Sequence, residues 1–268
     1  MFMKKQFLFL STIAFMVLAA SCNKDDKDTP TPSDPDPVDS TVTPTPTAPT
    51  APTPAVANVY GTLVSVSMKY SYTNSMVPMP VSIESEVAVA AFPTALNSST
   101  LADAGTVSVN SITLEKADNN AYYKSASVGM TPATLDFTTG SSWSVGGSGS
   151  VAGFTYNHTG DFPEYTGDLP TTITKSSDLV IDLGTSHVSD ADSVYIVVAA
   201  GNTFVQKSVA GNASSATITS AELAGLPDVS DNTALIEVVP FRIDFETFNG
   251  KVYAFIKERA VVSSVNID

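Results

Sequence analysis

Apolar and polar residues alternate with a period of two along most of the chain after residue 58. Val64, Val66, Met68, Tyr70 and Tyr72 alternate with serine and lysine, a pattern typical of a strand with one buried face. Helical periodicity is nearly absent, and the one helix we expect is a single turn at Ser220–Leu223. Similar β-branched and aromatic runs predict further strands at 81–92, 105–115, 121–128, 142–157, 171–183, 193–209 and 214–219.

Turn residues predict two hairpins. Asn249-Gly250 is the dipeptide preferred in a type I′ turn, so residue 248 should face 251 and residue 243 should face 256. This register places on one face Phe241, Ile243, Phe245, Val252, Ala254 and Ile256. The other face carries Arg242, Asp244, Glu246 and Lys257, with Tyr253 and Phe255 among them. A second hairpin is expected at Gly201-Asn202, and a change of apolar parity predicts a β-bulge near Asn110-Ser111.

The strand pattern predicts an all-β fold after a long linker. Ten or so short strands over about 200 residues are typical of β-sandwich packing. Pro163, Gly167 and Pro170 cluster where the chain should divide, so we expect two β-sandwich (immunoglobulin-like) modules, at 59–167 and 168–268. A single larger sandwich is the alternative.

The first residues have the three parts of a signal peptide, which we assign to 1–21. Lys4 and Lys5 precede the apolar run 7–18, and small residues lead to Cys22, the only cysteine of the chain. The stretch Leu18-Ala19-Ala20-Ser21-Cys22 resembles the bacterial lipobox, and this resemblance implies that Cys22 is acylated and becomes the new N-terminus. The following Asn-Lys-Asp-Asp-Lys-Asp (23–28) is similar to the export signal of Bacteroidota surface lipoproteins. Together these segments imply an outer-membrane lipoprotein that faces the cell exterior, with the periplasmic orientation as the alternative.

Residues 22–58 are expected to form a disordered, lipid-anchored linker. From residue 29 onward the segment consists mainly of Pro, Thr, Ala, Asp and Ser, which bury too little apolar surface to offset the entropy lost on ordering. In polyproline II conformation it would extend by about 3.1 Å per residue, or roughly 100 Å in all. Asp39-Ser40-Thr41 also resembles the O-glycosylation motif of Bacteroidota proteins, which makes Ser40 a candidate glycosylation site.

Charge and motif content argue against several functions. The formal net charge is −14, so we expect no nucleic-acid binding, which needs basic surface to neutralise phosphates. His158 and His187, the two histidines, are predicted to lie in solvated loops, and no Gly-x-Ser-x-Gly or HExxH motif is present. We therefore expect no catalytic residues, no metal site and no cofactor, although a β-sandwich hydrolase is the third alternative.

Three aromatic residues are the candidate ligand-binding side chains. Trp143 lies in a glycine-rich stretch and is followed by Tyr156 and Tyr165. Exposed together, they would stack on sugar rings; the alternative is that Trp143 is a core residue, since tryptophan is usually well buried. The leading functional hypothesis is a surface-displayed, non-enzymatic binding or adhesion module for a glycan or a protein partner. A structural or accessory subunit of an outer-membrane or fibre assembly is the second.

Overall fold

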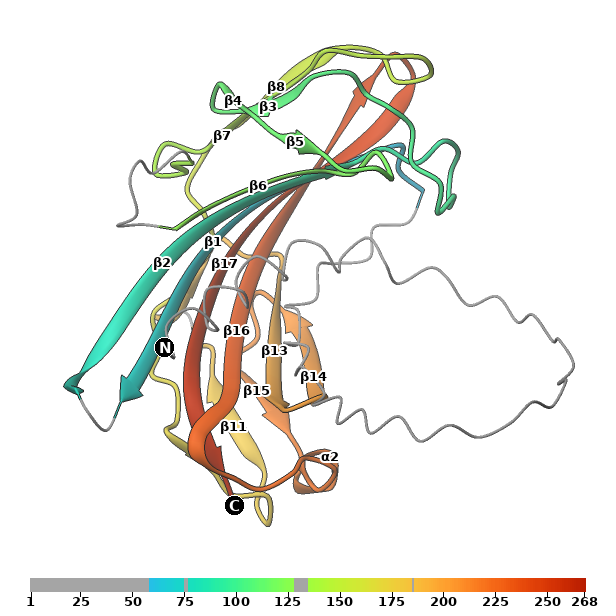
Figure 1. The fold of residues 1–268 in the computed structure, drawn as a ribbon. Coiled ribbons are helices and arrows are strands. Elements are labelled where there is room, and N and C mark those ends of the chain that lie inside the picture. Colours follow the sequence, from blue (N-terminus) through green and yellow to red (C-terminus); the bar gives the residue numbers. More distant parts are fainter. Residues whose placement is uncertain (1–57, 75–76, 128–134, 185) are drawn as a thin grey trace, which may run out of the picture.

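A computed structural model of the chain describes residues 58–74, 77–127, 135–184 and 186–268, and Cys22 and Ser40 lie outside these ranges. The described residues are nearly all β, as the alternation predicts, with one short helix (Figure 1). The largest sheet has the strand order β14-β13-β16-β17-β1-β2-β6-β5, and β10 also pairs with β17. Its strands are β1 (Thr62–Asn74), β2 (Val77–Ala91), β5 (Glu115–Lys116), β6 (Tyr122–Ser127), β10 (Thr172–Ile173), β13 (Ser193–Ala200), β14 (Thr203–Ala210), β16 (Val229–Phe248) and β17 (Lys251–Ile267).

The hairpin of β16 and β17 confirms the predicted turn and register. Asn249 and Gly250 both have positive φ, 49° and 74°, as a type I′ turn requires. Phe248 pairs with Lys251 and Ile243 with Ile256. The hairpin at Gly201-Asn202 is confirmed as well, since Ala200 pairs with Thr203. Figure 1 shows β16 and β17 running the length of the molecule, and this hairpin lies in the middle of the large sheet.

The predicted bulge near Asn110-Ser111 is wrong, because these two residues form a hairpin turn. Their φ values are 48° and 67°, and Val109 pairs with Ile112 across the turn. The change of parity in the sequence therefore marks a reversal of the chain between β3 (Val107–Val109) and β4 (Ile112–Thr113). Asparagine tolerates the left-handed conformation better than most residues, which explains its place in this turn.

Strands from both sides of the expected division at 167/168 share the large sheet. β1 pairs in parallel with β17 over ten consecutive residue pairs, from Thr62↔Ala254 to Ser71↔Ser263. The arrangement does not confirm two separate immunoglobulin-like modules, because one continuous sheet belongs to both halves of the chain. What it establishes is an all-β fold built from several sheets.

Two hydrophobic cores lie on the same face of this sheet, which we call the core face. The first core lies against a four-stranded sheet of order β4-β3-β7-β8, with β7 at Ser141–Val145 and β8 at Phe154–His158. The second core includes Leu223 of the helix α2 (Ser220–Leu223), whose predicted single turn is confirmed and carries a capping box between Thr219 and Glu222. Its other elements are β9 (Glu164–Tyr165), β11 (Leu179–Asp182), β12 (Val188–Ser189) and β15 (Ser215–Ile218).

The opposite side of the large sheet, which we call the reverse face, is also apolar. Because successive strand residues point to opposite sides, Phe255 of β17 lies on the core face and Ile256 lies on the reverse face. Three further clusters occupy the reverse face, and among the described residues they contain side chains of β1, β2, β13, β16 and β17 only. Their buried members are Val64, Met68, Val87, Val89, Val239, Phe241, Ile256, Ala260 and Val262.

Candidate functional site

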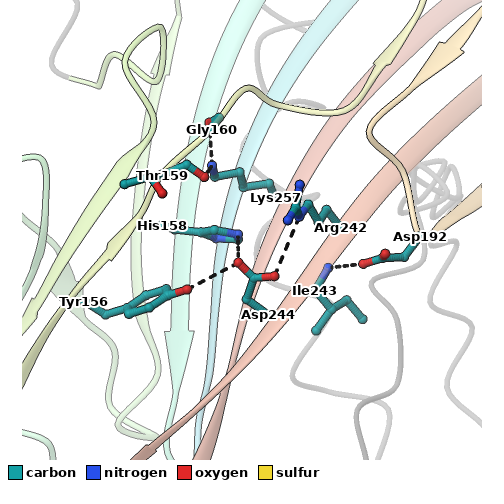
Figure 2. Close-up of polar contacts among 9 residues, drawn as sticks. All are labelled: Tyr156, His158, Thr159, Gly160, Asp192, Arg242, Ile243, Asp244 and Lys257. Carbon is teal, nitrogen blue, oxygen red and sulfur yellow. Dashed lines mark hydrogen bonds and ion pairs between the residues drawn. The ribbon is translucent and has the colours of Figure 1, made fainter.

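A group of charged side chains lies on the core face between the two cores. Lys257 of β17 is flanked by Arg242 of β16 and Ser65 of β1, its cross-strand partners. Strand β8 brings Tyr156 and His158 to Asp244, and the chain just after β8 passes over Lys257 (Figure 2). We call Tyr156, His158, Arg242, Asp244 and Lys257 the polar cluster.

Asp244 is the centre of the polar cluster. Its Oδ2 lies 3.0 Å from Nε2 of His158 and accepts a hydrogen bond of 3.3 Å from the Tyr156 hydroxyl. Its Oδ1 lies 3.7 Å from Nε of Arg242 (Figure 2). Burial and the neighbouring carboxylate of Asp244 raise the pKa of Tyr156 to about 12, so the phenol stays a donor at neutral pH. Three side chains thus converge on one carboxylate.

His158 is buried, which corrects the prediction of a solvated loop histidine. It ends β8 opposite Ser141 and is 1% exposed. Burial, followed by the charge of Lys257, lowers the pKa of His158 to about 4, despite the opposing effect of Asp244, so the imidazole is neutral at pH 7. The alternation Phe154, Tyr156, His158 is the sequence signal that places all three on one side of β8.

Lys257 is fully buried and ties the large sheet to the loop after β8. Its Nζ donates hydrogen bonds to the carbonyl oxygens of Thr159, at 2.9 Å, and Gly160, at 2.7 Å (Figure 2). Nζ also lies 5.6 Å from the ring centre of Phe162, within cation–π range. Burial and the nearby Arg242 lower the pKa of Lys257. Two residues further on, Arg259 pairs with Glu164 of β9 at 3.2 Å, so two cations hold this segment on the sheet.

His158 and Asp244 of the polar cluster, together with the neighbouring Ser141, are the residue types of a hydrolase triad without its geometry. Ser141 faces His158 across β7 and β8, but its Oγ is buried and has no hydrogen-bond partner among the described residues. A serine nucleophile needs a hydrogen bond to the base and a path for the substrate. Since Ser141 has neither the bond nor the exposure, the geometry of the cluster favours a structural joint between the two cores.

The three aromatic candidates from the sequence lie in different environments. Trp143 is 0% exposed within the first core, and Tyr165 is 4% exposed within the second, where its hydroxyl donates to the Asp168 carbonyl at 3.2 Å. Tyr156 is half-buried and belongs to the polar cluster. The structure therefore does not bring the three together on one exposed surface.

The remaining histidine, His187, and the two glutamates of β2 have ordinary surroundings. His187 is partly exposed, with Nε2 3.6 Å from Asp182. Glu84 and Glu86 share the core face of β2, as their spacing predicts, and burial raises the pKa of Glu86. Within the described ranges, no three His, Cys, Asp or Glu side chains converge in a way that would hold a metal ion.

The reverse face carries two buried carboxyl groups. Glu237 of β16 and Glu258 of β17 are each 2% exposed, and one oxygen of each has no hydrogen-bond partner in the described part of the chain. Burial raises the pKa of Glu237 to about 7 and that of Glu258 to about 8. The sequence analysis did not predict that these two residues are buried, because a glutamate within an apolar run does not indicate which face of the strand is covered.

The reverse face also has exposed aromatic residues at its margins. Phe204 of β14 and Phe245 of β16 are 57% and 55% exposed, and the strand registers place both on this side. Large exposed apolar side chains beside a contiguous apolar surface are typical of binding sites. The reverse face therefore combines a buried apolar area, exposed aromatic residues at its margins and two buried carboxyl groups.

Comparison of the chain with protein-family models, with curated protein sequences and with solved structures finds no match. None of the helices in the described ranges has the length and apolarity needed to cross a lipid bilayer.

Proposed function

We propose that this chain is a lipid-anchored, non-enzymatic binding module of the outer membrane and that the exposed margin of the reverse face is its binding surface. The observation that carries the proposal is the exposure of two aromatic residues there. Phe204 and Phe245 are 57% and 55% exposed and lie beside the buried apolar clusters of that face. Large exposed apolar side chains beside a contiguous apolar surface are typical of binding sites.

The location is proposed from the N-terminal sequence. Acylation of Cys22 would anchor the mature chain, and residues 23–58 would lift the folded part from the membrane. The Lys-Asp-Asp stretch after Cys22 supports display on the exterior. Modification of Ser40 would keep the linker extended and hydrated.

The organisation into two sandwich modules is also a proposal. Its support is the distribution of the two cores, one formed mainly by residues 63–162 and the other by residues 165–267. The change from one core to the other falls close to the division expected at 167/168. In this view the two modules share one sheet and are joined by the polar cluster.

The burial of Trp143 and Tyr165 favours an apolar or protein ligand over a glycan stacked on these aromatics. Sugar recognition by stacking requires an exposed ring face. Among the described residues, the exposed large apolar side chains include the rings of Phe204 and Phe245, on the reverse face.

A second candidate function is that of an accessory subunit in a surface assembly. The observation that favours it is the edge strand β14, which ends the large sheet and pairs only with β13 within the described part. An unpaired strand edge can accept a strand from another chain. Recovery of a stable partner whose binding is lost on changing Val205 to proline would support this function.

Fluorescence of the apolar dye N-phenyl-1-naphthylamine tests the proposed binding surface. The protein is the mature chain from residue 22, with Cys22→Ser to prevent acylation. We expect saturable binding of the dye and about fivefold weaker binding for Phe245→Ser, since burial of part of a phenylalanine contributes roughly 1 kcal/mol. Val180→Ser is the matched control, because Val180 is 59% exposed on β11 and away from the large sheet. Absence of binding, or equal loss in both variants, would contradict the proposal.

A further inference from the structure

The polar cluster holds a neutral imidazole between two cations and one carboxylate. The side chain of His158 is fully buried, and its Nε2 lies 3.0 Å from Oδ2 of Asp244 (Figure 2). Lys257 donates to the carbonyl oxygens of the two residues that follow His158, and Arg242 lies 3.7 Å from the other oxygen of Asp244. A proton on His158 would therefore add a third cation beside one carboxylate, in a site that solvent screens poorly.

Four described segments supply the groups around His158: β7, β8, the loop after β8 and the β16–β17 hairpin. The ionisable side chains of these segments that act on the polar cluster are Tyr156, Asp161, Arg242, Asp244, Glu246 and Lys257. β7 places the uncharged Ser141 opposite His158. Asp244 is in contact with the imidazole and favours its protonation, whereas Lys257 and Arg242 oppose it. The neutral imidazole is therefore the form that fits the closed joint.

The two carboxyl groups of the reverse face respond to acid in the opposite way. Burial raises the pKa of Glu237 to about 7 and that of Glu258 to about 8, so their protonated forms contribute stability that is complete below pH 4.5. Burial and Lys257 lower the pKa of His158 to about 4, so its neutral form contributes stability that is lost as pH falls from 6.5 toward 4. Between pH 6.5 and pH 4.5 the large sheet thus gains stability while the joint loses it.

We propose that the polar cluster is an acid-sensitive joint, in which protonation of His158 releases β8 and the following loop from the β16–β17 hairpin while the large sheet stays folded. The contacts that open are those of Asp244 with Tyr156 and His158 and those of Lys257 with the loop. This conformational response goes beyond the binding function proposed above and does not depend on it.

Thiol labelling in the mature chain with Cys22→Ser tests the proposal. Ser141→Cys places a buried thiol opposite His158, and Val194→Cys places a buried thiol on β13, in the second core. Both thiols are labelled with dithiodipyridine at pH 7.5 and pH 4.5, and each rate is divided by that of a free cysteine peptide. The open form binds the proton more tightly, so we expect the corrected rate at residue 141 to rise by up to roughly 50-fold at pH 4.5. The rate at residue 194 should stay constant.

Two variants identify the group that takes up the proton. His158→Gln keeps a neutral polar group beside Asp244 but does not titrate, so the rise at residue 141 should disappear. Arg242→Gln keeps the histidine and removes one opposing cation, which should reduce the rise, because the closed form then accepts the proton more readily. His187→Gln is the matched control, since His187 is the other histidine and is partly exposed. It should leave the rise unchanged.

Three results would overturn the inference. An equal rise at residues 141 and 194 would mean that acid unfolds the whole chain. A rate at residue 141 that does not change with pH would mean that the joint stays closed. A rise that persists in His158→Gln would mean that another group takes up the proton. None of these results bears on dye binding at the exposed margin of the reverse face, so the two proposals fail separately.

Discussion

Lys257 and Glu258 are consecutive residues of β17, they point to opposite faces of the large sheet, and both are buried. The lysine meets carbonyl oxygens and a carboxylate-centred cluster on the core face. The glutamate meets only apolar cross-strand neighbours on the reverse face. One dipeptide thus contributes a hydrogen-bonded ammonium group to the joint between the cores and a buried carboxyl group to the reverse face.

Lys257→Met should destabilise the fold strongly. The change keeps the apolar stem but leaves the carbonyls of Thr159 and Gly160 without their donor, at a cost of about 2 kcal/mol or more. Urea unfolding of the purified chain measures the loss. Lys69→Met is the control, since Lys69 is exposed on the same face of the sheet. Equal stability of the two variants would argue against the joint.

His158→Gln should remove a pH dependence of stability. Because burial lowers the pKa of His158 to about 4 in the folded state, its neutral form contributes stability above the unfolded value of 6.5. That contribution is lost as pH falls from 6.5 toward 4, by at most about 1.4 kcal/mol per pH unit. The stability lost on substitution should therefore be larger at pH 7.5 than at pH 5. If the stability lost on substitution did not vary with pH, His158 would be exposed in the folded protein.

Glu258→Gln should change the pH dependence of stability in the opposite direction to His158→Gln. Burial raises the pKa of Glu258 to about 8, so the protonated group contributes stability that is complete below pH 4.5 and is lost as pH rises through about 8. The variant should gain stability relative to the parent chain as the pH rises from about 4.5 to about 8, measured by urea unfolding. Glu84→Gln should show no such gain, and a gain in both variants would point to net charge instead.

Trp143 is a fluorescent probe of the first core, because it is the only tryptophan of the chain. With 0% exposure, its fluorescence should be blue-shifted and poorly quenched by acrylamide. Trp143→Ala should cost about 3–5 kcal/mol, as expected for removal of a large buried side chain. Efficient quenching in the folded protein would instead indicate that Trp143 is exposed and is again a candidate ligand contact.

Local features of the fold were predictable from the sequence. The turn residues Asn249-Gly250 and Gly201-Asn202 define both hairpins and their registers, because turn length and side-chain parity agree. The capping residues Thr219 and Glu222 define the one-turn helix in the same way. Each of these features depends on residues that are close together in the chain.

The remote features were not predictable in this way. The parallel pairing of β1 with β17 joins residues about 190 positions apart, and no local pattern indicates it. Ser65 and Lys257 are neighbours through this pairing, and both are buried on the core face, where the segment after β8 lies over Lys257. Alternation identifies a strand with two kinds of side chain, but it does not tell which face is covered. For the same reason no sequence pattern indicated that His158, Glu237 and Glu258 are buried.

Labelling of a cysteine placed at residue 66 tests the central claim, that the reverse face is a ligand-binding surface, most directly. In the mature chain with Cys22→Ser, Val66→Cys provides a single thiol beside Glu258, and Val180→Cys provides a matched thiol on β11. We predict that maleimide modifies both and that N-phenyl-1-naphthylamine, at roughly ten times its Kd, slows only the reaction at residue 66, by about tenfold. Equal rates with and without the dye, or equal slowing at residue 180, would contradict the claim.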